Sequence, residues 1–148
     1  MKAKELISKH FDTLETIFLI IFAIGLGTIL LQKSFSIYVF GAGSILLAIL
    51  YWIKAIQRNN TENLKIRYSE KFVWYSLMIA PIAIFSKLNL YEKSDLFLLF
   101  SIILMLIALI IRLYQKISKK AEVPNSDITR LIIALIISSF LYSFPFVN

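Results

Sequence analysis

The sequence predicts an all-α integral membrane protein, a bundle of five transmembrane helices with a cytoplasmic N-terminus and an external C-terminus. The first reason is composition: 59% of the 148 residues are hydrophobic and the mean hydropathy is +0.78, whereas soluble domains are about 45–50% apolar. The second is that charged residues are confined to short blocks between long apolar runs. The third is that the basic residues alternate in number from block to block. Together these predict one helical membrane domain over 1–148.

Five uncharged runs define the expected helices: Thr16–Gln32, Ser34–Ile53, Phe72–Ser86, Leu96–Ile111 and Leu131–Asn148. A hydrocarbon core about 30 Å thick needs about 20 helical residues, so the shorter runs are extended into their flanks. The expected spans are about 14–32, 34–53, 72–91, 95–114 and 128–147. The expected cytoplasmic basic loops are 54–71 and 115–127.

The third span is the doubtful one, because Phe72–Tyr91 contains Pro81 and Lys87. Basic residues in successive blocks number 3, 1, 5, 2, 5 and 0, as five spans with a cytoplasmic N-terminus require. If this stretch did not cross, the two blocks of five would lie on opposite sides. We therefore expect a full span, with Lys87 reaching outward, and likewise Arg112 at the end of the fourth span. A re-entrant segment that turns at Pro81 is the alternative.

Small residues predict how the helices pack. All four glycines lie in the first two spans, whose connection is short, so we expect a tight antiparallel hairpin with close contact at Gly27 and Gly41. Proline lacks a backbone donor, so we expect Pro81 to bend the third helix. The alternative role for such residues is to line a substrate path or a gate. The candidate packing or path residues are Ala23, Gly25, Gly27, Gly41, Gly43, Ser44, Ala48, Ser76 and Pro81.

The sequence offers no recognisable active site. The middle of each expected span carries no ionisable side chain, and such groups mark most ion-coupled transporters. Glu15 and Asp95 lie at span ends, where a first-turn acid is favoured by the helix dipole. The chain has no cysteine and one histidine, His10, in the polar N-terminal segment. We therefore expect no catalytic residue, no cofactor and no metal site.

The expected function is that of a small, non-enzymatic accessory or interaction subunit of the bacterial inner (plasma) membrane, acting through helix packing. A passive channel or small-molecule transporter is the alternative, and a small membrane enzyme is the third reading. The hydroxyls of a channel would be Thr28, Ser44, Ser76, Ser101 and Ser138. The net charge of +7 is explained by cytoplasmic retention of basic residues, not by nucleic acid. The expected partners are the lipid bilayer, anionic lipid head groups at the basic loops, and a membrane-protein partner or a second copy.

Overall fold

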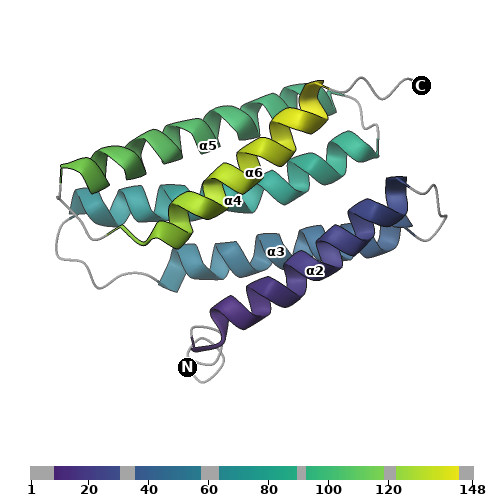
Figure 1. Ribbon diagram of the computed structural model, residues 1–148, viewed down its shortest axis with the longest axis horizontal. Helices are drawn as coiled ribbons and strands as arrows, with labels where there is room; N and C mark the ends of the chain where they lie inside the picture. Colours follow the sequence, from purple (N-terminus) through teal and green to yellow (C-terminus); the bar gives the residue numbers. More distant parts are fainter. Residues whose placement is uncertain (1–8, 31–35, 58–63, 90–92, 119–122, 144–148) are drawn as a thin grey trace.

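A computed structural model describes residues 9–30, 36–57, 64–89, 93–118 and 123–143. Within these ranges the regular structure is helical, without strands (Figure 1). The helices are α2 (Phe11–Leu30), α3 (Ser36–Gln57), α4 (Leu64–Leu88), α5 (Ser94–Ile117) and α6 (Asn125–Ser143). Each of the five is long and apolar enough to cross a membrane, which confirms the helical part of the predicted fold.

Helix α4 contains most of the doubtful third span. It is one unbroken helix of 25 residues that continues through Pro81, so the re-entrant turn expected as the alternative is not formed. The expected basic loop 54–71 is shorter than predicted, because α3 continues to Gln57 and α4 already begins at Leu64. Lys87, expected to reach outward, is instead buried and pairs with Asp95 at the start of α5. The carboxylate of Asp95 compensates the charge of the Lys87 ammonium, so the lysine side chain does not have to extend into water.

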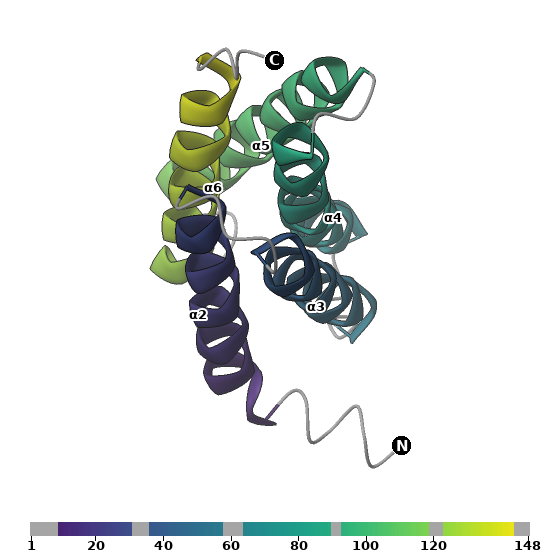
Figure 2. The same cartoon turned by 90° about the vertical axis from the view of Figure 1, so that its right-hand side faces the viewer.

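The helices form two layers. Helices α3, α4 and α5 lie side by side in one layer, and α2 and α6 lie over them in the other (Figures 1 and 2). Helix α2 packs on α3, whereas α6 packs on α5 and α4. Among the described residues, no Cα atom of α2 lies within 8 Å of one in α6. The second layer is therefore open between its two helices.

The α2–α3 hairpin is tight, but not at the residues expected. A Cβ atom on Gly25 would lie 2.5 Å from the Cα of Phe40, and one on Gly43 would lie 2.8 Å from the backbone nitrogen of Phe22. Small residues allow this approach of two backbones. A Cβ on Gly27 would meet nothing within 4 Å, so the contact expected there is wrong. Helix α2 is rotated so that Gly25, two residues earlier, faces α3.

Two other expected packing residues also differ from the prediction. Ala23 is exposed, so it does not contribute to the hairpin contact. Gly41 is buried but faces α4, where a Cβ would lie 3.0 Å from the ring of Phe85. The small residues of α3 therefore serve two neighbours: Gly43 contacts α2, and Gly41 contacts α4.

Helix α5 presents a buried stripe to α4 and α6. The stripe alternates steps of four and three residues, which is the spacing of a seam between nearly antiparallel helices. Its members are Ser94, Leu98, Ser101, Met105, Ala108, Arg112 and Gln115. Arg112 belongs to this stripe, so its side chain points into the protein and not toward lipid or water.

Candidate functional site

One end of the bundle gathers charged side chains from α2, α5 and α6 and uncharged polar ones from α3 and α4. Because successive helices run in opposite directions, the starts of α2, α4 and α6 meet the ends of α3 and α5, toward the left of Figure 1. We call the connected group there the polar cluster. Its members are Asp12, Glu15, Tyr51, Ser69, Arg112, Gln115, Asp127 and Arg130.

The first half of the polar cluster joins α2 to α6. The guanidinium of Arg130 donates from Nε to both carboxylate oxygens of Glu15, at 2.7 and 2.9 Å, and from Nη2 to Oε2 at 2.6 Å. The Tyr51 hydroxyl of α3 donates to the same carboxylate at 2.9 Å. Glu15 is only 4% exposed, and charge-assisted bonds of this kind are the strong ones. Side chains therefore connect two helices whose backbones do not touch.

The second half joins α6 to α5 and α4. Arg112 Nη2 lies 2.8 Å from Asp127 Oδ2, with side chains 0% and 3% exposed. Gln115 accepts a bond from Arg112 at 3.2 Å and donates one to Ser69 of α4 at 2.6 Å. The second oxygen of Asp127 lies 3.5 Å from Arg130, which links the two halves. The polar cluster is thus continuous from α4 to α2.

A polar cavity of about 380 Å³, the vestibule, opens beside the polar cluster. Its lining residues are Phe11, Asp12, Lys54, Gln57, Trp74, Pro124, Ser126, Asp127 and Arg130. The Lys54 ammonium lies 4.3 Å from the centroid of the Phe11 ring, and the Arg130 guanidinium lies 5.7 Å from that of Trp74. Cations within about 6 Å of an aromatic face are attracted by the ring quadrupole. The aromatic rings therefore hold the two cations at the vestibule wall.

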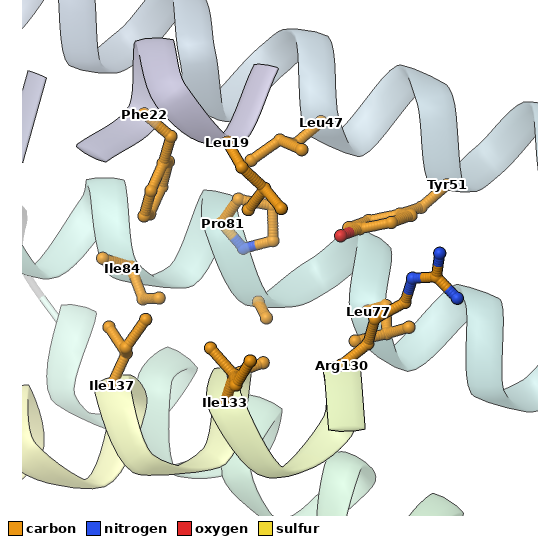
Figure 3. Close-up of a pocket in the computed structure, with 12 residues that line it drawn as sticks. Leu19, Phe22, Leu47, Tyr51, Leu77, Pro81, Ile84, Arg130, Ile133 and Ile137 are labelled. Atoms are coloured by element: carbon orange, nitrogen blue, oxygen red, sulfur yellow. The ribbon is translucent and has the colours of Figure 1, made fainter. Parts of the chain in front are cut away.

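An apolar cavity of about 90 Å³, the groove, lies between α2 and α6 (Figure 3). Its floor comes from α3 and α4, and its walls come from α2 and α6. The lining residues are Leu19, Phe22, Leu47, Tyr51, Leu77, Ala80, Pro81, Ile84, Arg130, Ile133, Ala134 and Ile137. Arg130 also lines the vestibule, so the two cavities share one residue at the polar cluster. In Figure 3 its guanidinium lies near Tyr51, at the end of the groove.

Of the candidate residues predicted from sequence, Pro81 is the one that lines the groove. Ser44 and Ser76 are buried and donate to backbone carbonyls of their own helices, at 2.8 Å in each case. Ala48 is buried on α3, with Gly41 and Gly43. These positions serve helix contacts and bring no polar group to either cavity.

The hydroxyls expected of a channel are buried or bonded within their own helices. Thr28 donates to the Gly25 carbonyl at 2.9 Å, within its own helix. Ser101 and Ser138 are fully buried, on α5 and α6 respectively. None of the five hydroxyl residues named for a channel lines the groove or the vestibule.

Sequence reasoning missed most of the polar cluster. The basic-residue count treats Arg112 and Arg130 only as charges that set orientation, and it gives no sign that Asp127 is their partner. Arg112 was also expected to reach outward, which is wrong because Asp127 neutralises it inside the protein. The sequence does contain a signal for Arg112. It lies seven residues after Met105, which lies seven residues after Leu98, and this repeat predicts that all three face the same neighbour and are buried.

The described residues contain no group of three or more His, Cys, Asp or Glu side chains placed to hold a metal ion. Comparison of the chain with protein-family models, with curated proteins and with solved structures finds no match.

Proposed function

We propose that the protein is a small, non-enzymatic multi-pass protein of the bacterial inner membrane. It acts through packing in the bilayer, as an accessory subunit or lipid-facing interaction module. Its contact surface is the groove between α2 and α6. The observation that carries this proposal is that these two helices leave an apolar cavity open between them, although side chains tie them together at one end. Apolar pockets with a few polar groups at one end are the usual form of a binding site.

The other two functions have less support. A transport path needs polar groups along its length, and none of the five candidate hydroxyl residues lines either cavity. A membrane enzyme needs an available acid or base. The two buried carboxylates of the polar cluster, Glu15 and Asp127, are each held in an ion pair with arginine. A carboxylate that is held by an arginine connects two helices but is poorly placed to transfer a proton.

The proposed orientation places the polar cluster at the cytoplasmic end of the bundle and both basic connections in the cytoplasm, because basic residues are retained there. Single cysteines in the cysteine-free chain test this. Tyr38→Cys and Lys93→Cys should react with an impermeant thiol reagent added outside the inner membrane. Leu64→Cys and Asn125→Cys should react only after the membrane is opened. All four positions are exposed, unlike Ser36, which is buried and therefore a poor probe.

Leu64 and Lys93 are the informative pair, since they bracket α4. Labelling of both from one side in a stable full-length protein would show that α4 does not cross. Labelling of all four with sidedness reversed would keep the five spans and invert the orientation. A denatured sample of each variant, labelled to completion, controls for the reactivity of each thiol.

The contact surface is tested by filling the groove. Ile133 lines the groove on α6 and is 52% exposed, so Ile133→Trp adds bulk there without burying a strained side chain. We expect this variant to fail to restore the phenotype of cells that lack the gene, at unchanged protein abundance. Ile136→Trp is the matched control, because Ile136 lies on the same helix and is exposed outside the groove. Full restoration by both variants would contradict the proposed function.

A further inference from the structure

We propose that the groove and the vestibule form one binding site for a phospholipid with a zwitterionic head group. One acyl chain lies in the groove, and the phosphate and ammonium groups of the head lie in the vestibule. This inference rests on the proposed function, because it names the occupant of the same contact surface. It is carried by the size of the groove, by the residue that the two cavities share, and by the charges of the vestibule.

The size of the groove separates an acyl chain from a partner helix. A helix about 10 Å across would rest on the two walls of the groove without entering it, whereas the groove itself is a narrow cavity of about 90 Å³ that takes part of one acyl chain. The small residues that would let a partner helix approach closely are already used inside the protein, at Gly25 and Gly43. A thin, flexible hydrocarbon chain fits a narrow cavity between bulky aliphatic side chains.

Arg130 makes the two cavities continuous. It lines both of them, at the point where the apolar groove meets the polar cluster. Ile133 and Ile137 line the groove three and seven residues after Arg130, so the groove follows α6 for about 10 Å into the apolar part of the bundle. A ligand that occupies both cavities needs an apolar tail joined directly to a polar head. A membrane phospholipid has that form and reaches the groove from the side, between α2 and α6.

The vestibule offers donors for a phosphate. Lys54 supplies an ammonium, Ser126 supplies a hydroxyl, and both residues line the cavity. Trp74 also lines it and is 1% exposed, and its indole N–H has no acceptor among the residues that the structure describes. A buried donor without a partner costs free energy, so a phosphate oxygen at this place would be stabilised.

The charge balance favours a zwitterion over an anion. The acidic side chains that line the vestibule are Asp12 and Asp127, and the basic ones are Lys54 and Arg130. Two negative and two positive charges cancel. The carboxylate of Asp12 accepts one bond from Arg130 at 3.1 Å and is 90% exposed, so its remaining lone pairs are accessible to an ammonium group. A phosphoethanolamine head carries both charges, whereas a phosphoglycerol head carries the negative one alone.

Lipid binding by the full-length protein tests the inference. The protein is purified in a mild non-ionic detergent, and native mass spectrometry follows added phosphatidylethanolamine, phosphatidylglycerol or glycerophosphoethanolamine, the head group without acyl chains. We expect one tightly bound phosphatidylethanolamine, weaker retention of phosphatidylglycerol, and no binding of glycerophosphoethanolamine. Ile133→Trp should weaken phosphatidylethanolamine binding by about tenfold or more, and Lys54→Gln by about tenfold, the effect of losing one charge-assisted contact.

Ile136→Trp and Lys116→Gln are the matched controls, since both residues are exposed and line neither cavity. Equal binding by the wild type, Ile133→Trp and Lys54→Gln would overturn the inference, because lipid would then bind elsewhere. Tighter binding of phosphatidylglycerol would overturn the assignment of the head group. Binding of glycerophosphoethanolamine alone would show a soluble ligand and not a lipid. In each case the proposed function is still supported if Ile133→Trp does not restore the phenotype of cells that lack the gene and Ile136→Trp does.

Discussion

Replacing Arg112 with methionine should lower the free energy of unfolding by about 3–5 kcal/mol, the cost of breaking a buried ion pair by removing one member. In this variant Asp127 stays buried, at 3% side-chain exposure, loses the guanidinium 2.8 Å away and keeps only the longer contact of 3.5 Å with Arg130. Gln115 loses a hydrogen bond at the same time. Denaturant unfolding of the full-length protein in mixed micelles, followed by tryptophan fluorescence, measures the loss.

Two further variants show that the loss comes from the unpaired charge. Lys116→Met, at an exposed position on the same helix, should change the free energy of unfolding by no more than about 0.5 kcal/mol. The double variant Arg112→Met/Asp127→Leu should recover most of the loss, because an apolar pair of similar volume often replaces a buried ion pair without cost. Equal stability of Arg112→Met and Lys116→Met would contradict the buried pairing.

Gly25→Leu and Gly43→Leu should each destabilise the protein by about 3 kcal/mol or more, at or above the upper end of the range for overpacking. The first atom of either new side chain would lie within 2.9 Å of the facing backbone, which cannot rotate away as a side chain does. Thermal unfolding of the full-length protein in detergent, with loss of helical circular dichroism as the signal, measures the effect.

Gly27→Leu is the matched control, because it makes the same substitution on α2 at a position with open space. We expect it to change stability by no more than about 0.5 kcal/mol. Gly41→Leu should lie between the two, since it meets the ring of Phe85, a side chain that can shift. If Gly27→Leu destabilised as much as Gly25→Leu, the rotation of α2 described here would be wrong.

The polar cluster explains why the groove stays open. Helices α2 and α6 are joined by the ion pair of Glu15 and Arg130 and not by packing of their backbones. An arginine side chain is long enough to connect two helices while keeping them apart. The same residue therefore holds the walls of the groove in place and forms its polar end.

The sequence by itself predicted the five long apolar helices found in the described part of the chain. Long uncharged runs define helices because a polypeptide in a bilayer must satisfy its backbone hydrogen bonds within the segment. The hairpin of α2 and α3 was also predictable, since its glycines are adjacent in the chain and its connection is short. These inferences depend on local composition, and neighbouring residues suffice for them.

The tertiary structure alone decided which charges are buried and where the cavities lie. A hydropathy scale gives every charged residue an unfavourable free energy of transfer into the membrane, so it predicts that each one lies in a loop. An arginine that pairs with a carboxylate is nevertheless stable inside the protein. Glu15 and Arg130 are 115 residues apart, so no local pattern relates them. The rotation of each helix about its axis, which selects Gly25 over Gly27, depends on the packing of its neighbours. The groove exists only because α2 and α6, the first and last described helices, face each other across the floor formed by α3 and α4.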